Sequence, residues 1–220
     1  MLFLDEAPEF RINVLRALRE PLEDGVVTIS RAEGSVLLPA DFQLILAANP
    51  CPCGRLGTKM REEGELSACF CSGDEIARHW RKLGGALLDR IELRVPMTNL
   101  LKDEGPHSQE AETSAKIALR VQRAVEIQRD RFKKLPCRRN ARMGPALVNR
   151  FCSLESQAQQ AFSRASEKLY LSGRAQHAAL RLARTIADLE GSDTISPYHI
   201  LEAVEHRRYG DDPYDLLKAL

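Results

Sequence analysis

Two short apolar runs that each end in polar side chains constrain the fold of this 220-residue chain more than any other feature. The first, Leu2–Leu4, is followed by Asp5 and Glu6, and the second, Leu44–Ala48, is followed by Asn49. Runs without a polar face are typical of strands in a parallel sheet that is covered on both sides. Ligands of open α/β sheets bind beyond the carboxyl ends of the strands, so the polar residues after both runs are candidate site residues.

The pattern of apolar residues divides the chain into two parts. Over residues 1–98, strand-like runs alternate with short helical stretches such as residues 11–22, and this alternation indicates an α/β layer. Residues 99–112 are polar and contain a Gly-Pro pair, so they are expected to form a linker. Residues 113–220 have helical spacing almost throughout. The predicted fold class is therefore α/β followed by all-α, with an incomplete parallel sheet in the first part.

Glycine, serine and proline mark the ends of several predicted elements. Two β-rich runs, GVVTIS and SVLLPADF, flank a turn with Gly34 and predict a β-hairpin inserted after a helix. Gly191 is expected to end a helix, and Ser196 with Pro197 is expected to begin the next one. The apolar face of the first of these helices consists of Ala175, Ala178, Leu182, Ala183, Ile186 and Leu189. Two further helices are expected, one with apolar positions at Ile117, Val121, Ala124 and Val125, and one over residues 147–154 with Cys152 in the core.

Charge and hydropathy limit the possible partners. The chain has 32 basic and 31 acidic residues, a net charge of +1, which gives no overall field that would attract nucleic acid. The basic cluster at residues 129–142 is still a candidate local contact. No apolar run approaches the roughly 18 residues that span a bilayer, and the first residues lack the basic flank of a signal peptide. A cytoplasmic protein is expected.

Four of the six cysteines form two C-x-C pairs, Cys51 with Cys53 and Cys69 with Cys71. Four thiolates that converge from two short loops fit the tetrahedral coordination of zinc, and the polar segment between the pairs could not fold by burial alone. The spacing C-x-C is less usual than C-x-x-C. Reduced thiols without a role, or a redox pair, are the alternatives.

The polar residues after the two apolar runs suit a phosphate site. The Asp5 carboxylate could hold a magnesium ion through its waters, Glu6 could orient an attacking water, and the Asn49 amide could fix that water or a terminal phosphate. The alternative is structural, with Asp5 and Glu6 capping the following turn and Asn49 closing a loop.

Several of these stretches carry a family resemblance. LFLDE resembles a Walker B strand, LILAANP resembles a sensor-one strand, and LLDRIEL resembles the arginine-finger segment of AAA+ ATPases. The inserted hairpin and the segment YLSGRAQHAALRLARTIADLEGSDTISPYHILEAVEHRRY resemble the magnesium-chelatase-like proteins of the YifB/ComM family. The resemblance extends from Leu2 to about Tyr209. It implies a partial AAA+ core over residues 1–98 and a helical lid over residues 113–220.

The resemblance also implies roles for individual residues. Asp5 would hold the magnesium ion of bound ATP, Glu6 would activate the hydrolytic water, and Asn49 would position that water. Arg90 would act as an arginine finger in the site of a neighbouring subunit, and Arg174 would be a sensor-two arginine that reaches the nucleotide of its own subunit. These roles imply a homo-oligomeric ring, with a hexamer as the expected form.

An ion pair to Asp89 or Glu92 is the alternative for Arg90. One part of the family pattern is missing, because the 220 residues contain no glycine-rich G-x-x-x-x-G-K-[ST] loop. We therefore expect the chain to be the C-terminal part of a longer protein, or the product of a truncated gene, and to have no ATPase activity by itself.

Three kinds of work are compatible with these residues. The resemblance favours a DNA-remodelling helicase of the competence or recombination type, with the hairpin toward the pore of the ring and Arg31 as a phosphate contact. The second is a chelatase-type motor that drives metal insertion into a tetrapyrrole. The third is a zinc-stabilised interaction module without catalysis.

Overall fold

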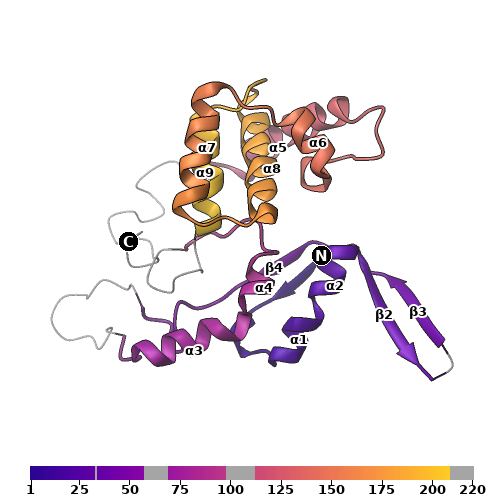
Figure 1. Ribbon diagram of the computed structural model, residues 1–220. Helices are drawn as coiled ribbons and strands as arrows, with labels where there is room; N and C mark the ends of the chain where they lie inside the picture. The colour runs from indigo at the N-terminus through magenta and orange to yellow at the C-terminus, as the bar shows by residue number, and fades with distance from the viewer. Residues whose placement is uncertain (33, 57–68, 98–111, 209–220) are drawn as a thin grey trace. The chain divides into compact units, whose positions relative to one another are not determined.

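The structure is a computed structural model that describes residues 1–32, 34–56, 69–97 and 112–208 (Figure 1). The described residues belong to two compact units, residues 1–91 and residues 92–208. The first is a mixed α/β unit with a small sheet and the second is helical, which confirms the predicted order of α/β followed by all-α. The predicted linker, residues 99–112, lies outside the described residues except at its last position. None of the described helices is both long and apolar enough to cross a membrane.

The small sheet of the first unit has two strands in the described part of the chain, β1 (Leu2–Leu4) and β4 (Leu44–Leu46). They are parallel, with Leu2 opposite Leu44. Both predicted strands are therefore observed in one small parallel sheet, where they lie side by side. Because both strands run in the same direction, their carboxyl ends lie at the same edge.

The two faces of this sheet differ. Leu4 is buried and packs in a core with Leu15 and Leu83. Side chains alternate between the faces of a strand, and on the other face Phe3 is 55% and Ile45 is 38% exposed. The prediction of strands covered on both sides is therefore wrong for this face, because the core of the unit forms on the Leu4 side.

The helices of the first unit are short. They are η1 (Ala7–Glu9), α1 (Ile12–Ala17), α2 (Arg19–Asp24), α3 (Gly73–Leu83) and α4 (Gly85–Leu88). The single helix predicted over residues 11–22 is divided at Leu18. Pro21 explains the break, because its nitrogen has no hydrogen to donate and its ring clashes with the carbonyl of Ala17, four residues earlier.

The predicted hairpin is confirmed. Strands β2 (Val26–Arg31) and β3 (Gly34–Pro39) are antiparallel, with Val26 opposite Pro39. The ribbon extends away from the other elements of its unit (Figure 1). Its large apolar side chains are consequently exposed, namely Ile29, Val36, Leu37 and Leu38.

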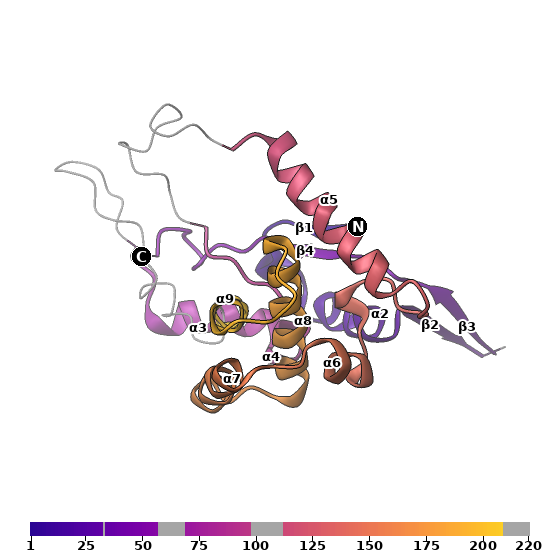
Figure 2. The same ribbon diagram turned by 90° about the horizontal axis from the view of Figure 1, so that it is seen from above.

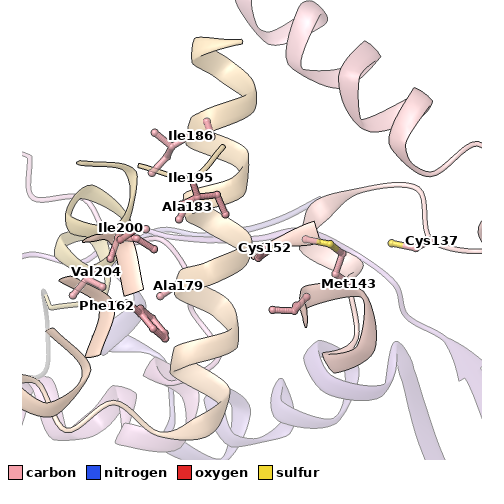
Figure 3. Close-up of a cluster of buried hydrophobic side chains, with 14 of the residues drawn as sticks. Cys137, Met143, Cys152, Phe162, Ala179, Ala183, Ile186, Ile195, Ile200 and Val204 are labelled. Carbon is pink, nitrogen blue, oxygen red and sulfur yellow. The ribbon is translucent and has the colours of Figure 1, made fainter. Parts of the chain in front are cut away.

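The second unit packs around α8. Its elements are α5 (Ser114–Arg131), η3 (Asn140–Arg142), α6 (Pro145–Phe151), α7 (Ser156–Lys168), α8 (Gly173–Glu190) and α9 (Pro197–Arg208). Figure 3 shows the core, in which Ala179 and Ala183 of α8 face apolar side chains from α7 and α9. Both alanines are fully buried. Their small size lets the neighbouring helices approach closely.

The helix ends of this unit agree with the sequence. Gly191 ends α8 in the left-handed conformation with φ 72°, and α9 begins at Pro197. The Ser196 hydroxyl accepts a hydrogen bond from the backbone N–H of His199 at 3.4 Å, which is the contact of a helix N-cap. These helix ends could be predicted because each depends only on neighbouring residues.

The first part of α5 differs from the prediction. Ala124 is buried as expected, but Ile117 and Val121 are exposed. Figure 2 shows why, because the N-terminal part of α5 extends past the helices that pack around α8. The helix predicted over residues 147–154 is observed as α6, and Cys152 lies in the core with 4% exposure.

A buried ion network joins α5, η3 and α8. Arg131 donates to both Asp188 carboxylate oxygens at 2.6 and 2.5 Å, and Arg184 donates to the same carboxylate at 3.1 Å. The Asn140 side-chain amide donates to Asp188 at 2.7 Å. The Asp188 side chain is fully buried. One carboxylate thus holds two cations and an amide inside the helical unit.

Removal of this carboxylate should destabilise the helical unit strongly. We expect Asp188→Ala to cost about 3–5 kcal/mol, because the buried Arg184 and the partly buried Arg131 lose their counter-charge. Guanidinium-induced unfolding followed by circular dichroism measures the loss. Glu202→Ala, which removes an exposed carboxylate on α9, is the control and should change stability by less than about 0.5 kcal/mol. Equal stability losses for both variants would contradict the importance of the network.

Candidate functional site

The carboxyl ends of β1 and β4 are joined by backbone hydrogen bonds. The N–H of Ala47 donates to the carbonyl of Leu4 at 2.9 Å, and the N–H of Ala7 donates to the carbonyl of Ala47 at 2.8 Å. These bonds bring Glu6 and Asn49 to a common cavity of about 210 Å³. The cavity is lined by Glu6, Pro8, Glu9, Asn49, Pro52 and His79. The structure thus brings together candidate residues that lie more than forty positions apart in the sequence.

Glu6 has an unusual backbone conformation. Its φ of 48° and ψ of 46° lie in the left-handed region, which is sterically costly for a residue with a side chain. Its N–H donates to the Asp5 carboxylate at 3.0 Å, and its carbonyl accepts from the N–H of Glu9 at 2.8 Å. Strained residues of this kind cluster at functional sites, where the surrounding structure holds them in place. The conformation therefore supports a functional role for this turn.

Two side chains of α3 hold the backbone after β4. His79 Nε2 lies 3.0 Å from the carbonyl oxygen of Asn49, and Trp80 Nε1 donates to the carbonyl of Pro50 at 3.0 Å. Because a carbonyl can only accept, Nε2 carries the proton in this contact. His79 is 5% exposed. Both bonds fix the loop that carries the Asn49 side chain.

His79 is not among the site residues predicted from the sequence. A signal was nevertheless available, because Ile76, His79 and Leu83 have helical spacing and form the buried face of α3. A histidine on such a face needs a polar partner. The partner itself could not be predicted, since it is a backbone carbonyl thirty residues away.

Arg90 and Arg174 do not line the Glu6–Asn49 cavity. Arg90 forms an ion pair with Glu23, and its Nη1 donates to the carbonyl of Ala86 at 2.7 Å. Glu92, one of the two partners considered for Arg90, instead forms an ion pair with Arg181. Arg174 is an exposed residue in the first turn of α8.

The four paired cysteines converge on one point. Their sulfur atoms all lie within 4.8 Å of one another. The Cys51 sulfur is 3.3 Å from that of Cys53 and 3.6 Å from that of Cys69. These separations are too long for disulfide bonds, in which the sulfur atoms are about 2.05 Å apart. They match the edge of a tetrahedron around a zinc ion, about 3.8 Å for Zn–S bonds of about 2.3 Å.

The surroundings of the cysteine cluster favour thiolate formation at one position. A hydrogen bond from the backbone N–H of Arg55 lowers the pKa of Cys53 to about 6, and the neighbouring thiol of Cys51 acts in the same direction. Cys51 is fully buried, whereas Cys53 is exposed. Most of the segment between the two pairs, residues 57–68, lies outside the described residues. The donor set and its spacing fit a soft divalent metal ion.

Sequence matches to known families cover both units. Residues 1–104 match the family model of the magnesium chelatase subunit ChlI, and residues 111–207 match the model of its C-terminal region. The chain is 39% identical over 212 residues to the competence protein ComM of Haemophilus influenzae, covering 94% of this chain and 38% of that protein. It is 38% identical over 211 residues to the uncharacterized protein YifB of Salmonella typhimurium, covering 94% of this chain and 39% of YifB.

The relation to YifB holds in a second organism. The identity to YifB of Escherichia coli is 37% over 212 residues, covering 94% of this chain and 39% of that protein. The chain thus spans about two fifths of the length of the relatives it matches. Because the two family models together match nearly all of its residues, the chain belongs to the family of the magnesium chelatase subunit ChlI, with ComM and YifB among its relatives.

Proposed function

We propose that this chain supplies catalytic residues for ATP hydrolysis by an AAA+ motor. The observation that carries the proposal is the common cavity of Glu6 and Asn49 at the shared edge of β1 and β4. Asp5, at the end of the same strand, would hold Mg²⁺ through its waters. The Glu6 carboxylate takes the proton of the attacking water, and the Asn49 amide orients that water. When bound, Mg²⁺ neutralises charge that develops on the phosphate oxygens.

Two arginines would complete the site in a ring, with a hexamer as the expected form. Arg90 acts in the site of a neighbouring subunit, where its guanidinium stabilises charge on the transferred phosphoryl group. Its present partner, Glu23, lies on the same unit and holds the guanidinium until a nucleotide competes for it. Arg174, in the first turn of α8, is proposed as the sensor-two residue.

DNA remodelling is the work that we propose for the motor. One relative is named a competence protein, and the exposed β2–β3 ribbon ends at Arg31, an exposed cation that suits a phosphate contact. Metal insertion into a tetrapyrrole is the second candidate, because the matching family models are those of a magnesium chelatase subunit. Stimulation of ATP turnover by DNA in the ring separates the two.

The experiment compares two proteins. The first is this chain alone, which lacks a glycine-rich phosphate loop within its 220 residues and is expected to show no ATP turnover. The second is a chimera in which the preceding part of the Haemophilus influenzae relative is fused to this chain. The chimera should assemble, hydrolyse ATP and respond to DNA. Turnover by the chain alone that is abolished in Glu6→Gln would contradict the proposal that a phosphate loop is required.

A structural zinc ion at the four cysteines is the second part of the proposal. Four sulfur atoms within 4.8 Å of one another support it, together with the buried position of Cys51. Cys51 follows Asn49 by two residues, and Cys71 precedes Ser72, the N-cap of α3. Zinc would therefore connect the end of the loop after β4 with the start of α3. A non-catalytic interaction module that keeps only this metal site is the third candidate function.

A further inference from the structure

The helical unit contains a cavity of about 660 Å³ that has no part in the proposed ATP site. It lies between the C-terminal end of α5, the following segment up to η3, and α8. Four of its lining residues are cations, namely Arg129, Lys133, Arg138 and Arg139. All four are exposed. We call these four residues the basic cluster.

The charge of the basic cluster is not neutralised within the described part of the chain. No aspartate or glutamate is among the described residues that line the cavity. Within that part, none of the four side chains has a carboxylate within 4.0 Å. The nearby Asp188 carboxylate is buried and already binds Arg131 and Arg184. The cluster therefore has a surplus of positive charge that faces solvent.

Hydrogen bonds of Asn140 hold the backbone that carries the basic cluster in place. The Asn140 N–H donates to the Gln128 side chain at 3.0 Å, and the Asn140 side-chain amide donates to Thr185 at 3.1 Å. Arg131 donates to the Asn140 side-chain oxygen at 2.8 Å. Both sides of the cavity are thus fixed to α8. The cations are presented on a rigid frame, which reduces the entropy lost when they bind a ligand.

We propose that the basic cluster binds the phosphodiester backbone of duplex DNA without sequence preference. Three of the four cations are arginines, whose guanidinium groups can form paired hydrogen bonds with phosphate oxygens. The exposed Lys134, which follows Lys133, extends the basic cluster into a longer strip of positive charge. A long polyanion with regularly spaced charges fits such a strip.

The cavity favours duplex over single-stranded nucleic acid. Proteins that bind single strands without sequence preference present aromatic side chains on which bases stack. Among the described residues that line the cavity, the aromatic one is Phe132, which is only 3% exposed and packs edge-to-face on Phe151. The cluster can therefore contact the nucleic acid only through its phosphates, as in non-specific binding of duplex DNA. This binding involves the helical unit alone and does not require ATP hydrolysis.

Fluorescence anisotropy with a 30-base-pair duplex of arbitrary sequence tests the proposal, using the full 220-residue chain without nucleotide at several salt concentrations. One double variant, Arg129→Gln with Lys133→Gln, removes two charges from one side of the cavity. The other, Arg138→Gln with Arg139→Gln, removes two charges from the opposite side. The control, Arg164→Gln with Lys168→Gln, removes two exposed charges from α7. Because the substituted side chains lack ion-pair partners in the described part of the chain, all three should unfold at the wild-type denaturant midpoint.

Each cluster variant should bind the duplex on the order of 10-fold more weakly at low salt and reduce the slope of log K against log salt by about 2, since each phosphate contact contributes about 0.9. The control should bind like the wild type. Equal losses in all three variants would overturn the location, and tighter binding of a 30-nucleotide single strand would overturn the duplex assignment. Binding of polyglutamate but not of DNA would identify an acidic protein as the partner instead. Failure of the ATP-turnover test leaves each of these results unchanged.

Discussion

Glu6→Gln should lower the ATP turnover of the chimera by at least about 100-fold, because proton transfer by a positioned side chain contributes about 10²–10⁴ to a rate. Glutamine keeps the size of the side chain and its place in the cavity with Asn49, but it cannot accept the proton of the attacking water. Since Glu6 would act on water, the KM for ATP should change little. Steady-state kinetics separates the loss in kcat from any change in KM.

Two further variants delimit this prediction. Asn49→Ala should lower kcat by about 10-fold or more, because the water loses its orienting amide. Glu202→Gln, at an exposed position on α9, is the control for the loss of a carboxylate and should keep the wild-type turnover. If Glu6→Gln and the control have the same kcat, the Glu6 carboxylate is not the base, and the cavity at the end of β1 has another use.

Cys51→Ser should abolish stoichiometric zinc binding by this chain. Cys51 is the buried member of the cluster and lies within 3.6 Å of two other sulfur atoms. Even residues that only support metal ligands cost about 10–100-fold in affinity when they are replaced, so loss of a ligand should cost at least about 100-fold. Elemental analysis of protein purified without added zinc should give one zinc ion per wild-type chain and none for the variant.

The stability of the first unit should fall together with the metal content. Metal binding couples to folding, so the melting temperature should drop by about 5–10 °C for a loss of 1–2 kcal/mol. Cys137→Ser is the matched control, because its sulfur belongs to the helical unit and donates to the carbonyl of Arg139 at 3.2 Å, a bond that a hydroxyl can also form. Four freely reactive thiols and no bound metal in the wild type would contradict the zinc site.

The parts of the fold that could be predicted from the sequence depend on local or repeating signals. The strands β1 and β4 follow from two apolar runs, the hairpin from β-rich runs around Gly34, and the boundary between α8 and α9 from Gly191 and Ser196. The proximity of Glu6 and Asn49 follows in turn, since parallel strands end at the same edge of a sheet. The hairpin and the helix boundary are fixed by neighbouring residues, whereas the sheet edge follows from the common direction of its strands.

The parts that could not be predicted depend on contacts between distant residues. Arg131 and Asp188 lie 57 positions apart, and neither has a local pattern that indicates its partner. His79 binds a backbone carbonyl, which has no sequence signature. The exposure of Ile117 on α5 depends on how far the neighbouring helices extend. The spacing of apolar residues gives no information about that. Tertiary packing decides all three.

The left-handed conformation of Glu6 has a consequence for protein engineering. Glycine adopts a φ of 48° without steric cost, whereas a residue with a side chain pays about 1–2 kcal/mol for it. A redesign that optimises only stability would therefore select glycine at this position. The same substitution would remove the carboxylate from the end of β1. Under the role that we propose for Glu6, residue 6 is thus a position where higher stability and ATP hydrolysis require different amino acids.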